Sequence, residues 1–184
     1  MTANKGRSLP FVRLSYALNR TPTGRRTATP ARKAARYFAF GKDRQAEREG
    51  EQRGEWYGPD GQIHTHEEVL AWAAGQAKEH QYTFQALLSV PEGRLRPADF
   101  TLALQEARYI DSWRLMSHED TAHSHAHVLF FRDGRMEKEV FADWHQQIRH
   151  HLAALEERNL GGEQAEEVLQ PGLDRGREGG LEWD

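Results

Sequence analysis

The sequence predicts an α+β fold, with a central, mainly antiparallel sheet of about four or five strands and helices over one face. Short β-prone runs alternate with segments whose apolar residues recur at helical spacing. The last two β-prone runs are joined by only a few residues, which suffice for a turn between antiparallel strands but not for a crossover helix. The length of 184 residues suits one domain of about 150 residues with tails.

The N-terminal part of the domain is expected to hold one strand and one short helix. Residues 8–17 are apolar and aromatic, and Pro10 restricts them to an edge or to the entry of the sheet. Residues 19–30 are turn-forming and basic, which predicts an exposed loop. A short helix is expected from Ala31, and the charged, glycine-containing segment 43–63 is expected to be a mobile insertion or lid.

The rest of the domain is expected to alternate helices and strands. Thr65 and Glu68 form a capping-box pattern that predicts the start of a helix over 66–80. The remaining predicted elements are strands at 81–90, 111–118 and 125–131, and helices from Pro97 and over 138–157.

The domain is expected to occupy residues 8–157, after a flexible start at residues 1–7. Residues 158–184 are acidic and rich in glycine. They show no periodicity from Gly161 onward, so a disordered tail is expected there.

The charge of the chain is unevenly distributed. The formal net charge is −3, but residues 1–42 hold ten of the 25 Lys and Arg residues and none of the 28 Asp and Glu residues. The other 142 residues therefore carry 15 basic and 28 acidic groups, a net charge of −13. A basic segment on an acidic body favours a polyanionic partner. If that partner is a nucleic acid, Tyr37, Phe38 and Phe40 are expected to stack on its unpaired bases. The basic residues expected to contact that partner are Arg25, Arg26, Arg32, Lys33, Arg36 and Lys42.

Composition also excludes several classes of site. The chain has no cysteine, which excludes disulfides, thiolate metal ligands and a cysteine nucleophile. No apolar run reaches the roughly 18–20 residues of a membrane span, and no signal peptide is visible. A cytoplasmic protein without a membrane partner is expected.

Four of the ten histidines, among them His123, lie within a stretch of ten residues. Alternate residues of a strand share a face, so His125 and His127 are expected to point the same way. Neutral imidazoles side by side form a platform for a divalent metal. His118 is the expected third ligand, because it ends a strand and the residues before His125 can form a turn. His123 is expected to support the site from outside or to be solvated.

Other interpretations of these histidines differ in how well they fit. The HxHxDH motif of metallo-β-lactamases is excluded because no Asp-His follows His125, and a cupin-like barrel needs more strands. A structural zinc site made of histidines stays open, although structural zinc usually uses cysteine. Surface positions are expected for His64, His66, His80, His145, His150 and His151.

The segment from His118 through Asp120-Thr121 to His125-x-His127 resembles motif III of the mobilisation-type (MobA-like) relaxases. This family is a branch of the HUH endonucleases, which nick single-stranded DNA. Its motif has a histidine, an Asp-Thr pair and then two histidines at the start of an apolar strand. The resemblance covers roughly residues 8–155.

Further positions follow the order of that family. The strand ending in Ser89-x-Pro91 precedes a helix and then the strand that ends in the first histidine. Upstream, the run ARKAARYFAF is similar to motif I, and Tyr37 matches its tyrosine. Phe40 stands where the family usually has an arginine, and Ser124 where it has a proline before the histidine pair.

The resemblance implies an HUH relaxase-like palm and metal-dependent nicking and joining of DNA. It assigns Mg²⁺ or Mn²⁺ to the three motif histidines. Tyr37 would be the nucleophile that forms a 5′-phosphotyrosine link and leaves a free 3′-OH. Asp120 would act as a base or orient a histidine. Tyr16 and Tyr57 are rival nucleophiles.

The partner implied by the resemblance is single-stranded DNA at an origin of transfer, in plasmid mobilisation or conjugation, together with accessory transfer proteins. A rolling-circle replication initiator or a transposase with the same site is a related alternative. A non-catalytic DNA-binding protein and a small metal-binding protein without a DNA role are alternatives from other classes.

Overall fold

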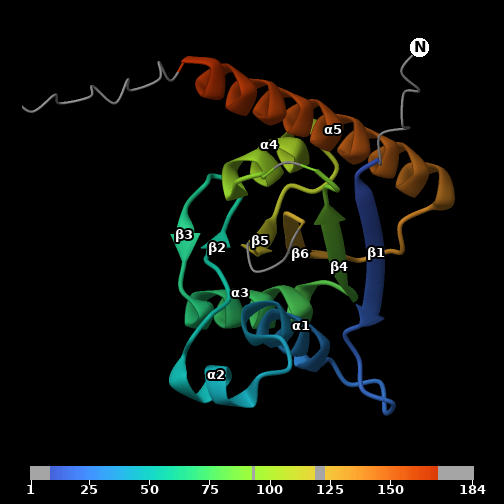
Figure 1. The fold of residues 1–184 in the computed structure, drawn as a ribbon. Coiled ribbons are helices and arrows are strands. Elements are labelled where there is room, and N and C mark those ends of the chain that lie inside the picture. Colours follow the sequence, from blue (N-terminus) through green and yellow to red (C-terminus); the bar gives the residue numbers. More distant parts are fainter. Residues whose placement is uncertain (1–8, 93, 119–122, 170–184) are drawn as a thin grey trace, which may run out of the picture.

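The computed structural model describes residues 9–92, 94–118 and 123–169, with the side chains of the last helix described to Gly161. Six strands form one open sheet in the order β1-β4-β6-β5-β2-β3, and every neighbouring pair is antiparallel (Figure 1). The sheet is one or two strands larger than expected. Its strands are β1 (Phe11–Leu18), β2 (Trp56–Tyr57), β3 (Ile63–His64), β4 (Tyr82–Ser89), β5 (Trp113–His118) and β6 (His125–Arg132).

Helices cover both faces of the sheet, so the expectation of helices over one face was wrong. In the view of Figure 1, α4 and α5 lie above the sheet, whereas α1 and α3 lie below it. The reason is visible in β6, whose residues are apolar on both faces: Val128 and Phe130 enter one core, and Leu129 enters the other. The helices are α1 (Thr29–Phe40), α2 (Arg44–Glu49), α3 (His66–Glu79), α4 (Pro97–Ala107) and α5 (Lys138–Leu169).

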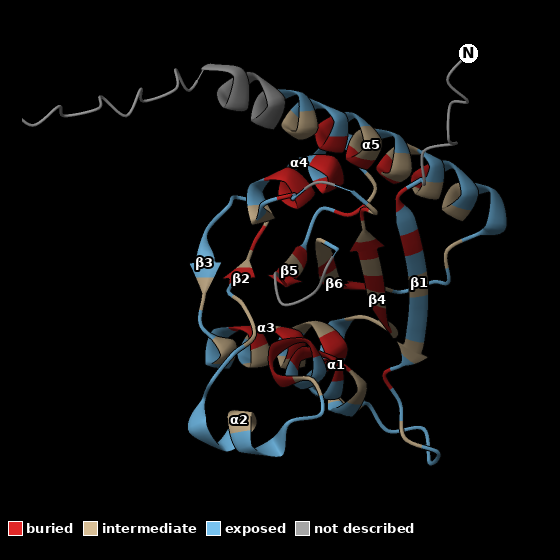
Figure 2. Cartoon of the chain, in the orientation of Figure 1, coloured by how far each residue is buried: buried red, intermediate tan, exposed pale blue. Residues whose placement is uncertain are grey.

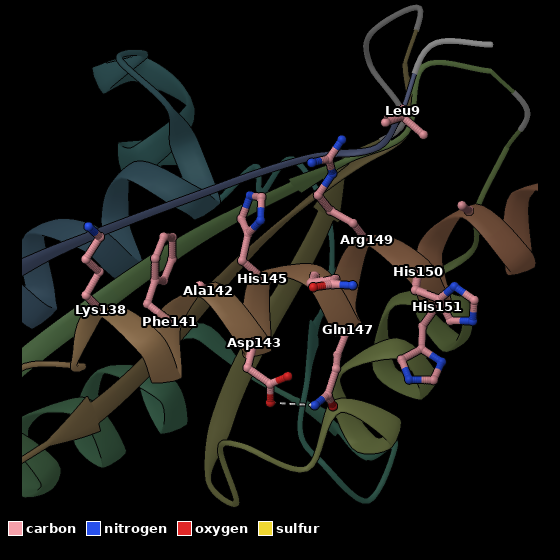
Figure 3. Close-up of a pocket in the computed structure, with 12 residues that line it drawn as sticks. Leu9, Lys138, Phe141, Ala142, Asp143, His145, Gln147, Arg149, His150 and His151 are labelled. Atoms are coloured by element: carbon pink, nitrogen blue, oxygen red, sulfur yellow. Dashed lines mark hydrogen bonds between the residues drawn. The ribbon is translucent and has the colours of Figure 1, made fainter. Parts of the chain in front are cut away.

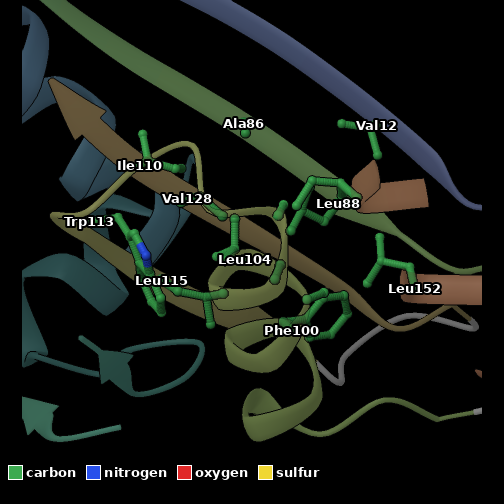
Figure 4. Close-up of a cluster of buried hydrophobic side chains, with 14 of the residues drawn as sticks. Val12, Ala86, Leu88, Phe100, Leu104, Ile110, Trp113, Leu115, Val128 and Leu152 are labelled. Carbon is green, nitrogen blue, oxygen red and sulfur yellow. The ribbon is translucent and has the colours of Figure 1, made fainter. Parts of the chain in front are cut away.

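The first core lies between the sheet and the layer of α4 and α5 (Figure 4). Its side chains come from alternate residues of the strands and from the inner faces of the two helices. Burying each large apolar side chain contributes about 1.5–3 kcal/mol. The labelled members are Val12, Ala86, Leu88, Phe100, Leu104, Ile110, Trp113, Leu115, Val128 and Leu152.

The second core lies between the sheet and the layer of α1 and α3. Alanines dominate the facing surfaces of these two helices, and such small side chains allow the backbones to approach closely. The larger side chains Phe38, Trp56 and Met116 fill the space between α1 and the sheet. The buried alanines are Ala31, Ala34, Ala35 and Ala39 on α1, and Ala73 and Ala77 on α3.

The predicted capping box at the start of α3 is confirmed. The Glu68 backbone N–H donates to Thr65 Oγ1 at 3.2 Å, and the Thr65 backbone N–H donates to the Glu68 carboxylate at 2.7 Å. These hydrogen bonds lower the pKa of the Glu68 carboxyl group. The strands expected at 81–90, 111–118 and 125–131 and the helix expected at 66–80 all form, with ends shifted by two residues at most.

The segment 43–63 is part of the fold, so its interpretation as a mobile insertion or lid was wrong. It contains α2 and the strands β2 and β3, and β2 pairs with β5 through Trp56 and Met116. The Trp56 side chain is fully buried. The backbone just before β2 also approaches β5 so closely that position 54 must be glycine, because a Cβ there would collide with the backbone oxygen of Ser117.

The helix α5 continues past the expected boundary at residue 157, so the prediction of a disordered tail was wrong for residues 158–169. Contacts with α4 and the segment before it account for the start of this extension. Arg158 lies 3.7 Å from Asp99, and Asn159 donates to the Arg94 carbonyl at 3.2 Å. Residues 170–184 of the predicted tail and the predicted flexible start at 1–7 lie outside the described residues. Within the described ranges, no helix combines the length and apolar character needed to cross a membrane.

Replacing Trp56 with alanine is expected to lower the free energy of unfolding by about 3–5 kcal/mol, because the substitution leaves a large cavity in the second core. Ile63→Ala is the matched control, since Ile63 lies on the neighbouring strand and is 59% exposed. It is expected to change stability by no more than about 0.5 kcal/mol. Urea unfolding measures both. A cost below about 1 kcal/mol for Trp56→Ala would support the lid interpretation.

Candidate metal centre

The three predicted metal ligands meet at the end of the β5–β6 hairpin. His118 is the last residue of β5 and lies directly opposite His125, the first residue of β6. His127 follows two residues later on the same face. This face is the one covered by α1 and α3, because Met116 and Leu129 at the same alternation enter the second core.

The three imidazoles are close enough to bind one ion. One nitrogen of each ring lies within 4.8 Å of the nitrogens of the other two. The ring centroid of His118 lies 5.0 Å from that of His125 and 5.1 Å from that of His127. His118 is buried, and the other two rings are partly exposed. An ion at this position would therefore be bound on its buried side by His118 and would remain accessible to solvent on the side of His125 and His127.

Hydrogen bonds fix which nitrogen of two rings faces the centre of the cluster. His118 Nε2 lies 2.9 Å from the Phe38 carbonyl oxygen, and His125 Nδ1 lies 3.2 Å from the His123 carbonyl oxygen. A carbonyl oxygen only accepts, so both of these nitrogens carry the hydrogen. In the neutral rings, His118 Nδ1 and His125 Nε2 then present lone pairs to each other across 3.1 Å. A cation bound by both relieves that repulsion.

This arrangement matches the usual support of a metal-bound histidine, in which the second nitrogen donates to a carbonyl or carboxylate. The separation of 3.1 Å is also suitable for a shared ion. Two nitrogens about 2.1 Å from one ion and at right angles lie about 3 Å apart. The donor set of three imidazoles therefore fits a divalent transition metal, and it leaves further coordination positions for other ligands.

The helix α1 supports the cluster through one residue, Phe38. Its carbonyl oxygen accepts from His118, and its ring stacks on His127 at a centroid distance of 4.5 Å and an interplanar angle of 23°. Sequence reasoning assigned Phe38 and Phe40 to stacking on DNA bases, but both side chains are buried, so that assignment was wrong. The apolar face of α1 is needed for packing on the sheet.

Tyr37 lies beside the cluster, with its ring edge-on to His127 at 6.2 Å and 81°. The side chain is 46% exposed. The rival nucleophiles Tyr16 and Tyr57 lie on the opposite face of the sheet, where Tyr16 contacts Phe84 and Tyr57 packs against the first core. The last two of the five tyrosines, Tyr82 and Tyr109, also pack against the first core. Tyr37 is therefore the one tyrosine on the histidine face.

Most of the predicted basic residues gather near Tyr37. A groove of about 710 Å³ runs along the outer side of α1, with Tyr37 in its wall and with the acidic residues Asp43 and Glu47 at one part of its lining. Arg36 forms an ion pair with Glu47 at 3.2 Å. The basic residues that line this groove, which we call the α1 groove, are Arg32, Lys33, Arg36, Lys42 and Arg44.

The other two predicted basic residues lie in the loop between β1 and α1. Arg25 is exposed there, and Arg26 donates to the His80 carbonyl oxygen at 2.7 Å, which ties the loop to the end of α3. Neither residue lines the α1 groove. The described part of the basic N-terminal segment, from residue 9 onward, is thus not a separate arm, because β1 pairs with β4 over its whole length.

His66 is a partly buried residue that the sequence placed at the surface. The Trp56 indole N–H donates to His66 Nδ1 at 3.3 Å, and the Phe40 ring lies edge-on to its imidazole at 5.0 Å. Burial, together with the Arg36 guanidinium, lowers the pKa of His66. Its position at the start of a predicted helix indicated exposure. The contact with Trp56 could not be predicted, because it depends on the strand β2, which the sequence did not indicate.

Two other features lie outside the set of three histidines. His123 contacts the Pro91 carbonyl oxygen at 3.0 Å through its side chain and supports His125 through its own carbonyl. A larger hollow of about 970 Å³ runs along α5, between Leu9 and the side chains of Phe141, His145 and Arg149 (Figure 3). It belongs to the α4–α5 side of the sheet and so is not part of the histidine site.

Asp120 and Thr121 of the motif lie outside the described residues.

Comparisons of the chain with protein-family models, with curated proteins and with solved structures find no match. The antiparallel α+β architecture follows from the strands and helices themselves. The capacity of His118, His125 and His127 to hold a metal ion follows from their geometry. The chemistry of the site is therefore inferred from its own residues.

Replacing His125 with alanine is expected to weaken Mn²⁺ binding by more than about 100-fold, because it removes a ligand and not only an outer partner, whose loss costs about 10–100-fold. His123→Ala is the matched control from the same segment, and it is expected to keep binding within about threefold because its supporting carbonyl remains. Titration calorimetry measures both affinities. Equal affinities for wild type and His125→Ala would exclude the three-histidine site.

Proposed function

We propose that this protein is a metal-dependent enzyme that nicks and rejoins single-stranded DNA at an origin of transfer in the cytoplasm, as HUH relaxases do. One observation carries the proposal: Tyr37, the one tyrosine on the histidine face, packs against His127 and lines a groove rich in basic residues. A histidine cluster that can hold a metal, a candidate nucleophile and a groove rich in basic residues thus adjoin each other on α1 and the β5–β6 hairpin.

In the proposed reaction the Tyr37 hydroxyl oxygen attacks the phosphorus of a phosphodiester. A bond forms between phosphorus and the tyrosine oxygen, and the bond from phosphorus to the 3′ oxygen breaks. The phenolic proton passes to solvent, and the departing 3′ oxygen takes up a proton to become a free hydroxyl. The product is a 5′-phosphotyrosine, from which the reverse step rejoins the strand.

A metal ion bound by the three histidines would polarise the phosphate and stabilise the charge that develops on its oxygens. The residues of the chain position the reactants. The stack of Phe38 on His127 holds that ring beside Tyr37. The cations of the α1 groove bind the phosphates of the strand through charge-assisted hydrogen bonds. Three imidazoles favour Mn²⁺ over Mg²⁺, which prefers oxygen ligands.

Replication initiators and transposases with the same kind of site would use identical chemistry on other DNA sequences. A non-catalytic DNA-binding protein would share the groove and lack the covalent step. The geometry favours the enzyme, because a protein that only binds DNA does not require a tyrosine beside three histidines that can hold a metal ion. Formation of a protein–DNA adduct separates these alternatives.

Tyr37→Phe is expected to abolish a covalent protein–DNA adduct that the wild type forms with Mn²⁺. The substitution removes only the hydroxyl oxygen, so the fold and the stacking of the ring are kept. The probe is a pool of random-sequence single-stranded oligonucleotides labelled at the 3′ end, because a 5′-phosphotyrosine link transfers that label to the protein. Denaturing gels detect the labelled protein, and EDTA is expected to prevent its formation.

Tyr16→Phe and Tyr57→Phe serve as matched controls and are expected to form the adduct at the wild-type rate, since both rings lie on the opposite face of the sheet. An adduct that persists in Tyr37→Phe would reject this nucleophile. A wild type that binds DNA but forms no adduct would favour the non-catalytic alternative.

Lys33→Ala is expected to reduce the magnitude of the salt dependence of binding to labelled dT20. The loss of one phosphate contact on single-stranded DNA lowers the slope of log Kobs against log salt by about 0.7. Fluorescence anisotropy at several salt concentrations gives the slope. Arg25→Ala, in the loop outside the α1 groove, is expected to leave the slope unchanged. A reduced slope in Arg25→Ala with an unchanged slope in Lys33→Ala would place the strand along the loop and not in the groove.

A further inference from the structure

The register of the sheet aligns the histidine cluster with an exposed aromatic ring on the edge strand β1. His118 lies opposite His125, His125 opposite Ser89, and Ser89 opposite Phe11. Residues directly opposite each other in antiparallel strands point to the same face. The Phe11 ring therefore lies on the histidine face, two strands away from His125. This ring is 54% exposed, which is unusual for a phenylalanine in a row that leads to a buried site.

Phe11 and Ser89 form one side of a hollow of about 420 Å³, which we call the Phe11 hollow. Leu9, Pro91, Glu92 and His123 complete its lining. Its volume lies in the range of about 300–1,000 Å³ that is typical of small-molecule pockets. The hollow adjoins the cluster directly, because the His123 carbonyl oxygen accepts from His125. The Phe11 hollow borders the histidine cluster at His125, whereas Tyr37 borders the cluster at His127.

The lining of the Phe11 hollow differs in charge from that of the α1 groove. Arginines and lysines line the α1 groove, whereas the Phe11 hollow has no basic Lys or Arg among its lining residues and contains the carboxylate of Glu92. A carboxylate repels a phosphate but accepts hydrogen bonds from amino and imino groups. The occupant that suits this hollow is flat and uncharged, with an aromatic face for Phe11 and polar edges for Ser89 and Glu92.

We propose that the Phe11 hollow binds an unpaired base of the DNA strand, next to the phosphate that a metal ion on the histidine cluster would hold. This inference rests on the proposed function and adds a base-binding site to it. The strand would be held by its phosphates in the α1 groove and by a stacked base on Phe11, with the cluster at the junction. Aromatic stacking suits such a site because every base presents a π face.

A base is favoured over a second copy of this chain as the occupant. The strand β1 is an edge of the sheet, and Figure 2 shows exposed residues along it. Pairing of two copies along this edge would bring the exposed Arg13 side chains of both copies to the new interface, and charged residues on edge strands discourage such pairing. A base needs only the ring of Phe11 and the hollow beside it.

The test compares binding of two labelled probes of equal charge: dT20, and a 20-residue abasic strand that keeps the phosphates and lacks the bases. Phe11→Ala is expected to weaken binding of dT20 by at least about fivefold and to leave binding of the abasic strand unchanged, because base stacking is lost while phosphate contacts are kept. Phe11→Trp is expected to restore binding of dT20. Leu18→Ala is the matched control and is expected to change neither affinity, because Leu18 is a similarly exposed apolar residue of β1 that lies on the opposite face of the sheet.

The two proposals fail in different ways. Equal affinities of wild type and Phe11→Ala for dT20, or equal losses on both probes, would overturn the base site and leave the adduct test of the nicking function intact. A wild type that binds neither probe would overturn the proposed function and the base site with it. Sedimentation velocity is run alongside: a dimer that Phe11→Ala converts to monomer, with both DNA affinities unchanged, would assign the hollow to a second copy and reject the base.

Discussion

The hydrogen bond from His118 Nε2 to the Phe38 carbonyl oxygen is the contact on which the rest of the site depends. It is buried, it joins residues 80 positions apart in the chain, and it connects the end of β5 to α1. By fixing the hydrogen on Nε2, it directs the lone pair of Nδ1 toward His125. The same residue of α1 stacks on His127, and the preceding residue is Tyr37. One helical turn thus orients two candidate metal ligands and the candidate nucleophile.

Much of the fold was predictable because its signals are local. The capping box of α3, the alternation in β6 and the apolar spacing of α5 each depend on residues a few positions apart, and all three elements formed. The two-residue strands β2 and β3 and the second helical layer were missed. Strands this short have no periodicity, and Trp56 enters the core only because β5 has an open edge to pair with. Burial of both faces of a sheet depends on strand order, which local patterns do not contain.

The candidate site shows the same division. The triad of His118, His125 and His127 was predictable, since the residues between β5 and β6 permit little but an antiparallel hairpin. The support of the triad was not, because it comes from a backbone carbonyl and a ring on a helix far away in the chain. The sequence predicted an exposed aromatic ring at Phe38 because basic residues surround it, and only the packing of α1 shows that this ring faces inward. Phe11 was unremarked because its link to the cluster runs through strand pairing.

The alanine face of α1 affects how firmly the helix that supports the site is held on the sheet. Alanines contribute little apolar area each, so the hold of this helix on the sheet depends on close contact with α3 and on the few large side chains between them. Such an element is a candidate for opening without unfolding of the whole domain. If α1 separates from the sheet, His118 loses its carbonyl partner and Tyr37 leaves the cluster in the same motion. Under the proposed function, separation of α1 would thus remove the candidate nucleophile and the support of His118 together, and a partly opened chain would not cut DNA.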